Sequence, residues 1–464
     1  MKCLLKIVFH AVGFLFILIN FSLAHASAKD EQILKIFKQQ KINTDHLSVE
    51  IRKNDKTIET INSKTLKSPA SVTKLLTTYA VLQKLPLGFK FKTQLFLAND
   101  NLYLKGSGDP TFVSEKMWFL VNELTRSKIT TFKNIVVDDS LFDQVRYDES
   151  RESRRVDRAY DAPVGAMSFN WNSVNIFIRP GEVNEKANVF LDPISDYYQL
   201  QNSTRTVLGA AKKELVISVL NDEKKISITG EVSKTALEKV VYKSIDDPSL
   251  WAGYQLKSFL KQRGIEVSGK VQKGEVPETA KIVSSSESKS LAEILADMNK
   301  FSNNFVAEML TKTLAAQNMS QSKTPATLNK GVEIIRDELI KLGLTTKDFV
   351  IVNPSGLTLE NRLSAFAGNE ILSAMKNDFR TYSLVLESLP IAGLDGTLKK
   401  RMKNSVAEGW VRGKTGSLDT VVSMAGFAGR KNGDIYTYTF LYNGPRDETI
   451  VREAFDQVLI SLLK

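Results

Sequence analysis

The sequence predicts a mixed α/β (α+β) fold in which one antiparallel sheet is built from both ends of the chain. Near the start, Leu47–Arg52 and Thr57–Ile61 alternate apolar and polar residues, as the two strands of a hairpin do. Near the end, Val421–Ala428 and Ile435–Tyr442 have the composition of neighbouring strands joined by a turn that contains two glycines. We expect these four segments to form a single sheet, flanked by the terminal helices.

Helical patterns flank and separate these strands. Asp30–Ile42 and Thr449–Leu463 place apolar residues at helical spacing and predict the two terminal helices. A third helix is predicted to begin at Ser71 and to end before Pro86, because apolar residues recur there at three- and four-residue steps: Val72, Leu75, Leu76, Tyr79, Leu82 and Leu85. A helical region, about residues 288–404, lies between the early and the late strands.

Residues 91–285 have a different character and predict an inserted α/β domain. They begin with a strand–helix–strand pattern and return, at Leu250–Arg263, to a helix followed by a strand at Ile265–Val271. Between these parts, about residues 172–232, short β-type segments dominate. We therefore expect a main domain of residues 27–90 and 286–464, interrupted by an inserted domain that itself carries a β-rich subdomain.

The first 26 residues have the organisation of a signal peptide. Lys2 and Lys6 precede an apolar stretch, Ile7–Ala24, and Ala24-His25-Ala26 has the small-x-small pattern of a cleavage site. An uncleaved membrane anchor is the alternative, since the apolar stretch approaches spanning length. We expect cleavage and export to the periplasm or the outer face of the cell envelope, with no stable membrane span afterwards.

Composition narrows the classes of function. The chain has 63 Lys and Arg against 52 Asp and Glu, and removal of a leader with two lysines and no acid leaves a net charge of +9. This charge suits work beside an anionic envelope polymer, and equally suits general solubility. No nucleic-acid motif and no Cys/His metal set is present, so neither nucleic acid, metal nor organic cofactor is expected. Cys3 is the only cysteine, and the mature chain would have none.

Three short motifs suggest serine chemistry. In chain order they are Ser71-Val72-Thr73-Lys74, Ser302-Asn303-Asn304 and Lys414-Thr415-Gly416. A serine with a lysine one helical turn away has a nucleophile and a base, and the later motifs add a second hydroxyl and a cation for a carboxylate. A Ser-His-Asp triad is disfavoured, because two of the three histidines, His10 and His25, lie in the leader and only His46 remains in the mature chain.

Each motif alone is a weak signal. Ser-x-x-Lys occurs at five other places, and a serine at a helix start is most often a cap. Ser302 and Asn304 are predicted to lie on a turn between two helices, where a capping role is the simpler reading. Lys414 and Thr415 are predicted at the entry to a strand. The order of the three motifs, together with the 231-residue separation of Ser71 and Ser302, makes the combination specific.

The chain resembles the class C low-molecular-mass (type-4) penicillin-binding proteins, the D-alanyl-D-alanine carboxypeptidase/endopeptidases. The resemblance extends over essentially the whole mature chain and includes segments outside the three motifs: Gly106–Thr111, Val137–Phe142, Asn304–Glu308, Ser355–Leu357 and Gly393–Leu398. It implies the transpeptidase-like fold of penicillin-recognising serine enzymes. Two positions depart from the family pattern: Asn353 replaces an expected acidic residue and Leu359 an expected basic one, which bears on peptide preference.

The resemblance implies a function and roles for the motif residues. Ser71 would attack the D-Ala–D-Ala bond of a peptidoglycan stem peptide, with Lys74 as base, made neutral part of the time by burial and by Lys414. Ser302 would pass a proton to the leaving amine, and Asn304 would bind the substrate amide. Lys414 and Thr415 would hold the terminal carboxylate, Gly416 would admit the substrate backbone, and the N–H groups of Ser71 and Ser417 would form the oxyanion hole. A β-lactam should acylate Ser71.

Two alternatives remain open from the sequence. A β-lactamase or esterase could use the same serine–lysine pair, although no Glu-x-x-x-Asn segment is well placed to position a deacylating water. A non-catalytic wall-binding relic is the other. The sequence does not decide between carboxypeptidase and endopeptidase activity, the third residue of the stem peptide, or the oligomeric state.

Overall fold

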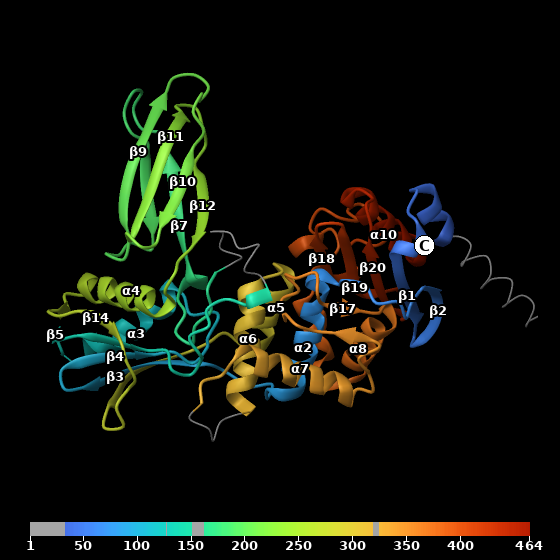
Figure 1. Ribbon diagram of the computed structural model, residues 1–464, viewed down its shortest axis with the longest axis horizontal. Coiled ribbons are helices and arrows are strands. Elements are labelled where there is room, and N and C mark those ends of the chain that lie inside the picture. Colours follow the sequence, from blue (N-terminus) through green and yellow to red (C-terminus); the bar gives the residue numbers. More distant parts are fainter. Residues whose placement is uncertain (1–32, 127, 151–161, 319–323) are drawn as a thin grey trace, which may run out of the picture.

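The computed structural model describes residues 33–126, 128–150, 162–318 and 324–464 (Figure 1). The predicted signal peptide, residues 1–26, lies outside the described residues. A five-stranded sheet with its helices forms one side of the molecule, and the inserted region forms the other. A slender β-rich part projects from the inserted region (Figure 1). Helices α5 (Leu291–Lys300), α6 (Asn304–Asn318) and α7 (Leu328–Lys341) lie between the two sides.

The expected antiparallel sheet from both ends of the chain is present. Its order is β18-β19-β20-β1-β2, so the N-terminal hairpin pairs with the last strand of the chain. The pairing of Val49 with Phe440 sets the register of this junction. The strands are β1 (Leu47–Lys53), β2 (Lys56–Ile61), β18 (Val411–Leu418), β19 (Val421–Gly429) and β20 (Ile435–Asn443).

Helices cover both faces of this sheet. On one face, residues 33–39 and α10 (Glu448–Leu463) bury Phe37 and Phe455 against Phe440. On the other face, α2 (Lys74–Lys84) and α8 (Ala365–Asn377) pack with α5, α6, α7 and α9 (Phe379–Ser388) into a second apolar core. Because α2 is buried along nearly its whole length, the residues at its start are held firmly in the interior.

The inserted region has a five-stranded mixed sheet of order β14-β6-β4-β3-β15. Its helices α3 (Ser114–Arg126) and α4 (Pro248–Gln262) pack on this sheet through residues such as Leu120 and Trp251. The predicted strand at Ile265–Val271 is instead two short strands, β13 (Glu266–Val267) and β14 (Val271–Lys273), on different sheets. The other strands are β3 (Lys92–Ala98), β4 (Asn101–Lys105), β5 (Thr131–Phe132), β6 (Ile135–Asp138) and β15 (Lys281–Glu287).

The β-rich part consists of two three-stranded sheets. One contains β9 (Gln199–Val207), β10 (Val216–Leu220) and β11 (Lys225–Ser233), and the other contains β7 (Ser173–Arg179), β8 (Asn188–Asp192) and β12 (Lys239–Ser244). Strands β9 and β12 were not predicted. Polar residues dominate the exposed face of β9, whereas β12 contains Val240, Val241 and Tyr242, which are typical of a strand. Pairing of β12 with β7 carries this part to Ser244, beyond the expected end near residue 232.

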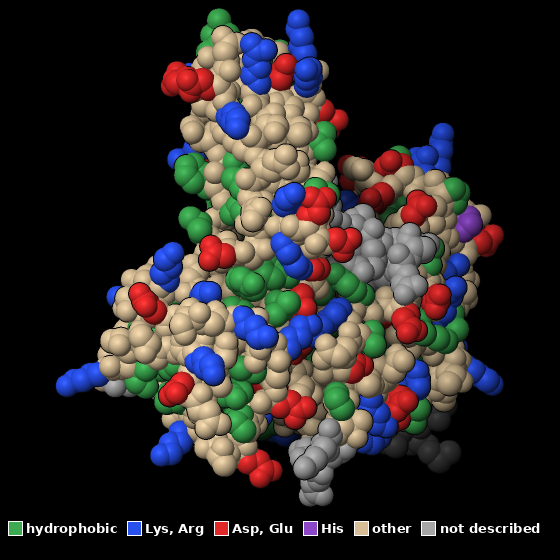
Figure 2. Space-filling view, turned by 60° about the vertical axis from the view of Figure 1, so that its left-hand side comes forward, with side chains coloured by type: hydrophobic (Ala, Val, Ile, Leu, Met, Phe, Trp, Pro, Cys, Tyr) green, Lys and Arg blue, Asp and Glu red, His purple; other side chains and the backbone are tan. Residues whose placement is uncertain are grey.

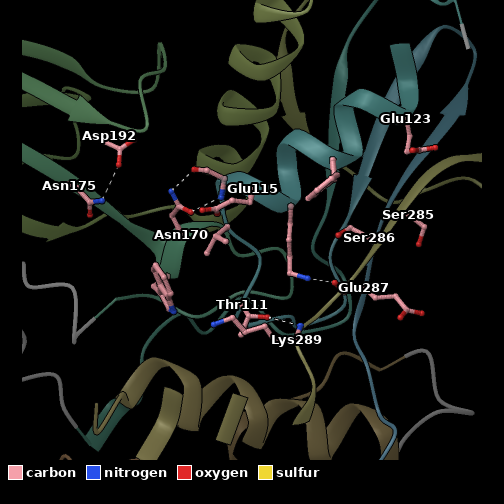
Figure 3. Close-up of a pocket in the computed structure, with 15 residues that line it drawn as sticks. Thr111, Glu115, Glu123, Asn170, Asn175, Asp192, Ser285, Ser286, Glu287 and Lys289 are labelled. Carbon is pink, nitrogen blue, oxygen red and sulfur yellow. Dashed lines mark hydrogen bonds between the residues drawn. The ribbon is translucent and has the colours of Figure 1, made fainter. Parts of the chain in front are cut away.

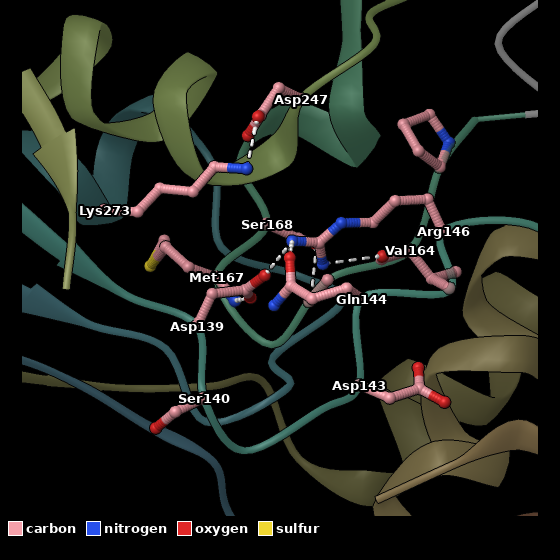
Figure 4. A network of polar contacts seen from close by, with 12 residues as sticks. Asp139, Ser140, Asp143, Gln144, Arg146, Val164, Met167, Ser168, Asp247 and Lys273 are labelled. Atoms are coloured by element: carbon pink, nitrogen blue, oxygen red, sulfur yellow. Dashed lines mark hydrogen bonds and ion pairs between the residues drawn. The ribbon is translucent and has the colours of Figure 1, made fainter. Parts of the chain in front are cut away.

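Polar contacts fix the junction between the inserted region and α6. Asp139, just after β6, pairs with Arg146 at 2.5 Å and accepts a hydrogen bond of 2.6 Å from Met167 N (Figure 4). Lys312 of α6 is buried, and its Nζ donates to Asp143 Oδ1 at 2.5 Å and to Val145 O at 2.7 Å. Because α6 also begins at Asn304, these contacts connect the inserted region to one of the predicted site residues.

Among the residues that the structure describes, no helix is both long and apolar enough to cross a bilayer. The same residues contain no group of three or more His, Cys, Asp or Glu side chains placed to hold a metal ion.

Candidate active site

Ser71 lies on a tight turn that leads into α2. The predicted single helix is a 3₁₀ turn, Ala70–Thr73, followed by the α-helix from Lys74. Ala70 has φ +46°, a left-handed conformation that places strain directly before the serine. The turn is held by Thr73 Oγ1, which donates to Ala70 O at 2.8 Å, and by Ser423 Oγ of β19, which donates to Pro69 O at 2.6 Å. Ser71 is half-buried, so its hydroxyl is accessible from one side.

The amine of Lys74 connects three parts of the site. Lys74 is fully buried, and its Nζ lies 3.1 Å from Ser71 Oγ, 2.7 Å from Asn304 Oδ1 and 2.5 Å from Ser355 O. Asn304 is the first residue of α6, and Ser355 lies in a loop after α7. The structure thus brings Ser71, Lys74 and Asn304 together, although the lysine and the asparagine are 230 positions apart.

Ser302 lies on the turn between α5 and α6, as expected. Its φ of +55° is unusual for a serine and turns the side chain toward β18, where Lys414 Nζ donates to Ser302 Oγ at 2.9 Å. The neighbouring Asn303 caps α6, with its Oδ1 accepting from Val306 N at 3.2 Å. The capping role considered for this motif therefore belongs to Asn303, while Ser302 and Asn304 both take part in the polar site.

Lys414 lies within β18, an edge strand of the sheet, and not at a strand entry as predicted. It is fully buried, and desolvation lowers its pKa from 10.5 to about 7. Its Nζ also donates to Thr415 O at 2.6 Å. A small change in surroundings, such as an incoming carboxylate, can therefore set the charge of this amine near neutral pH.

Gly416 allows β18 to run directly beside the serine turn. A Cβ at this position would lie 2.8 Å from Pro69 O, 2.9 Å from Ser71 N and 2.3 Å from Ser423 Oγ. No side chain fits without separating the strand from the turn, because backbone atoms cannot step aside. On either side of the glycine, Thr415 Oγ1 lies 2.8 Å from Thr397 Oγ1 and Ser417 Oγ donates to Glu448.

The loop that supplies Ser355 O was not predicted as part of the site. Asn353 is fully buried, and its Oδ1 accepts hydrogen bonds from Ser355 N at 2.9 Å, Ser355 Oγ at 2.6 Å and Gly356 N at 2.8 Å. Gly356 has φ +78°, and a Cβ there would lie 2.0 Å from Ala70 O. The loop is thus folded around one asparagine and packed against the serine turn. The family-like segment Ser355–Leu357 was the available sequence signal.

Asp148 of the inserted region also reaches this loop. Its Oδ2 accepts a hydrogen bond of 2.6 Å from Asn353 Nδ2, and both side chains are buried. A carboxylate therefore lies beside position 353, where an acidic residue was expected, but Asp148 of the inserted region supplies it. At the other departure, Leu359 is half-buried and its carbonyl accepts a hydrogen bond from the guanidinium of Arg362.

The site has a serine and a lysine one turn apart at the start of a buried helix. A second serine, an asparagine and a buried lysine join them from three other elements. This combination defines a penicillin-recognising serine hydrolase. The chain belongs to the D-Ala-D-Ala carboxypeptidase 3 (S13) family, whose model matches residues 29–462. It is therefore a hydrolase of a peptidase family, and the predicted family and enzyme class are confirmed.

The chain is similar to two named D-alanyl-D-alanine carboxypeptidases. The chain is 28% identical over 401 residues to a D-alanyl-D-alanine carboxypeptidase of Actinomadura sp. (strain R39), which covers 81% of this chain and 73% of the relative. It is 25% identical over 407 residues to the D-alanyl-D-alanine carboxypeptidase DacB of Haemophilus influenzae, covering 82% of each.

Solved structures confirm the predicted fold class. The crystal structure of penicillin-binding protein 4 from Haemophilus influenzae superimposes with a TM-score of 0.77 at 20% identity, covering 93% of this chain and 99% of that chain. The same protein in complex with a novel β-lactam gives a TM-score of 0.71 at 21% identity, covering 90% of this chain and 96% of that one.

Proposed function

We propose that this enzyme hydrolyses the D-Ala–D-Ala bond of peptidoglycan stem peptides through an acyl-enzyme on Ser71. The observation that supports this assignment is the position of Lys74 Nζ, 3.1 Å from Ser71 Oγ and held by two further acceptors, Asn304 Oδ1 and Ser355 O. In the neutral amine, the two N–H bonds serve those acceptors and the lone pair faces the serine hydroxyl. This geometry is that of a base ready to accept the Oγ proton.

Acylation follows from this arrangement. Ser71 Oγ attacks the carbonyl carbon of the penultimate D-Ala while its proton moves to Lys74 Nζ. The C–N bond then breaks, and the leaving nitrogen takes up a proton through Ser302 Oγ. One proton thus leaves Ser71 and one reaches the departing D-alanine. Water then attacks the ester carbonyl, the C–Oγ bond breaks, and a proton from that water passes to Ser71 Oγ as the shortened peptide leaves with a new carboxyl group.

Lys414 and Thr415 bind the free carboxylate of the terminal D-Ala. In the desolvated site, a substrate carboxylate beside Lys414 favours the protonated form of the lysine amine. The lysine cation and the substrate carboxylate therefore stabilise each other. The backbone N–H groups of Ser71 and Ser417 act on the carbonyl oxygen, and each such donor is worth about 3 kcal/mol in comparable sites. The close approach of Gly416 to Ser71 N supports this role, because it places β18, which contains Ser417, beside the turn that contains Ser71.

The same layout accepts β-lactams, which present a strained amide and a carboxylate. Acylation of Ser71 by penicillin opens the lactam ring, and the leaving nitrogen stays tethered to the ester. A slowly hydrolysed adduct is the expected product. With the proposed signal peptide at residues 1–26, we place the mature enzyme outside the cytoplasmic membrane, in the periplasm or at the outer envelope face.

Labelling with a fluorescent penicillin, followed by peptide mapping, tests the assignment. We expect the label on Ser71 and its loss in Ser71→Ala. The matched control is Ser258→Ala, which removes the serine of another Ser-x-x-Lys sequence and should label normally. Label on any other residue, or unchanged labelling of Ser71→Ala, refutes the nucleophile. Release of D-alanine from a pentapeptide tests the reaction, and rapid loss of the penicillin adduct would identify a β-lactamase instead.

A further inference from the structure

The inserted region contains a large pocket outside the serine site. Its volume is about 1100 Å³, just above the ~300–1,000 Å³ of small-molecule clefts, so it suits an oligomer better than one small metabolite. Helix α3 forms one wall, and strands β7 and β8 form another. In Figure 3, Asn175 and Asp192 lie on one side of the pocket, and Ser285, Ser286 and Glu287 of β15 lie on the opposite side.

Two aromatic side chains line this pocket and are exposed. Trp171 is 38% exposed and Phe119 is 61% exposed. Exposed aromatic rings beside amide and carboxylate groups leave an apolar face and polar edges available to a ligand. Such rings stack against the C–H faces of sugar rings, while amides and carboxylates bond the hydroxyl and acetamido groups at the ring edges.

The backbone around Trp171 is strained. Three consecutive residues, Asn170, Trp171 and Asn172, have φ values of +48°, +52° and +50°. A left-handed turn is tolerable for asparagine, but for a bulky residue such as tryptophan it is an outlier that costs about 1–3 kcal/mol. Strain of this kind persists only where neighbouring contacts enforce it, and it is concentrated at functional sites.

Hydrogen bonds enforce this turn from both sides. Asn172 Nδ2 donates to Pro163 O at 2.7 Å and to Ser168 Oγ at 2.8 Å. Asn170 and Ser114 exchange two hydrogen bonds of 3.1 Å, which join the turn to the start of α3. The indole of Trp171 is therefore presented on a rigid support at the pocket wall, which lowers the entropy cost of binding.

Four acidic and two basic side chains line the pocket, and two of the acidic ones are paired with bases outside the lining. Glu123 pairs with Arg126 at 3.0 Å, Glu287 with Lys90 at 3.6 Å and Lys289 with Asp297 at 3.0 Å. Asp192 accepts a hydrogen bond of 3.3 Å from Asn175 Nδ2. Figure 2 shows basic and acidic side chains interspersed over the face that includes the inserted region. Because basic side chains do not outnumber acidic ones in the lining, the pocket does not attract an anionic ligand and suits an uncharged one.

On the basis of the proposed function, we propose that this pocket binds the glycan strand of peptidoglycan, a chain of N-acetylated amino sugars whose lactyl carboxyl groups are joined to the stem peptides in uncharged amide bonds. Trp171 and Phe119 stack on sugar rings, and Asn170, Asn175 and Asp192 bond the hydroxyl and acetamido groups. Binding there holds the polymer on the inserted region. This site is separate from the bond-breaking site and needs no reaction at Ser71.

Calorimetric titration with N-acetylglucosamine oligomers tests the proposal, because these oligomers are uncharged N-acetylated sugars and contain no D-Ala–D-Ala group for the serine site. Wild-type protein should bind them. Trp171→Asn removes the indole at a backbone conformation that asparagine adopts readily, and should weaken binding at least about tenfold. The matched control is Trp410→Asn, since Trp410 is similarly exposed, at 40%, but lies outside the inserted region. This control should bind normally, and both variants should keep wild-type acylation by fluorescent penicillin.

A second variant, Phe119→Gln, tests the same pocket independently in case Trp171→Asn does not fold. Phe119→Gln changes the opposite wall on a helix that tolerates glutamine, and should also weaken glycan binding. The proposal is overturned if wild-type protein does not bind the N-acetylglucosamine oligomers, if neither pocket variant weakens binding, or if Trp410→Asn weakens it equally. Displacement of the oligomers by a sugar-free stem pentapeptide would assign the pocket to peptide and would also overturn it. A failure of penicillin labelling at Ser71, by contrast, would affect only the catalytic assignment.

Discussion

Asp148 of the inserted region accepts a 2.6 Å hydrogen bond from the buried amide of Asn353 in the main domain. Asn353 in turn holds the loop that directs Ser355 O toward Lys74 Nζ at 2.5 Å. A continuous chain of contacts therefore connects the inserted region to the proposed base, although Asp148 and Asn353 are 205 positions apart in the sequence.

Replacing Asp148 should disturb this chain at a distance from the reacting atoms. In Asp148→Ala the buried amide of Asn353 loses its acceptor, which should lower the free energy of unfolding by about 1–3 kcal/mol. We also expect a several-fold slower acylation by penicillin, because Ser355 O is less firmly placed. Asp148→Asn is the control, since its amide oxygen can still accept the bond. Equal acylation rates in all three proteins would contradict the connection.

Removal of the proposed base should affect the chemical step itself. Lys74→Ala leaves the Ser71 hydroxyl without an acceptor for its proton, and the acylation rate should fall about 100- to 10,000-fold. Stopped-flow or gel-based labelling at saturating fluorescent penicillin measures this rate. Lys84→Ala on the exposed end of the same helix should leave it unchanged. Substantial acylation by a folded Lys74→Ala protein would argue against the base.

Gly416→Ala tests the contact between β18 and the serine turn. The new Cβ would meet Ser423 Oγ, Pro69 O and Ser71 N at 2.3–2.9 Å, so the strand must move away. A displacement of about 1 Å at a reacting centre can cost about 100-fold in rate. We expect a loss of this order in penicillin acylation, with secondary structure retained by circular dichroism. Gly88→Ala is the control, because its Cβ would have no neighbour within 4 Å.

The pKa of Lys414 predicts a pH dependence for carboxylate recognition. Burial lowers this pKa from 10.5 to about 7, so the free enzyme carries the cation below pH 7 and loses it above. The value of kcat/KM for a D-Ala-ended peptide, which reports the free enzyme, should therefore fall as pH rises through this value. Lys414→Arg, which stays charged, should lose this limb of the profile. A peptide ending in a carboxamide should not show it in either protein.

The buried amine of Lys414 should also lower the free energy of unfolding at acidic pH. Between pH 7 and 10.5 the unfolded chain holds a proton on Lys414 that the folded chain has lost, so this residue's contribution to the free energy of unfolding rises with pH across that window. Lys414→Met removes the cost of the buried cation. We expect it to raise the melting temperature more at pH 6 than at pH 9, at the expense of activity. An equal shift at both values would show that desolvation does not act on this lysine.

Local patterns were sufficient for much of the fold. Apolar spacing in the helix after Ser71 and alternation in Leu47–Arg52 are properties of short segments, and each formed as predicted. Strand β9 was missed because most of its residues are polar and its place in the sheet depends on pairing with β11. The strand predicted at Ile265–Val271 was divided by pairing with two different sheets, which no single segment encodes.

The sequence by itself determined the identity and order of the proposed reacting groups, because three motifs and their spacing can be read along the chain. The tertiary structure decided how those groups are placed. It placed Asn304 Oδ1 and Ser355 O on Lys74, brought Asp148 to Asn353, and buried Lys414 deeply enough to bring its pKa to about 7. Burial and contact between residues some 200 positions apart depend on the packing of the whole chain, and for that reason only the folded protein shows them.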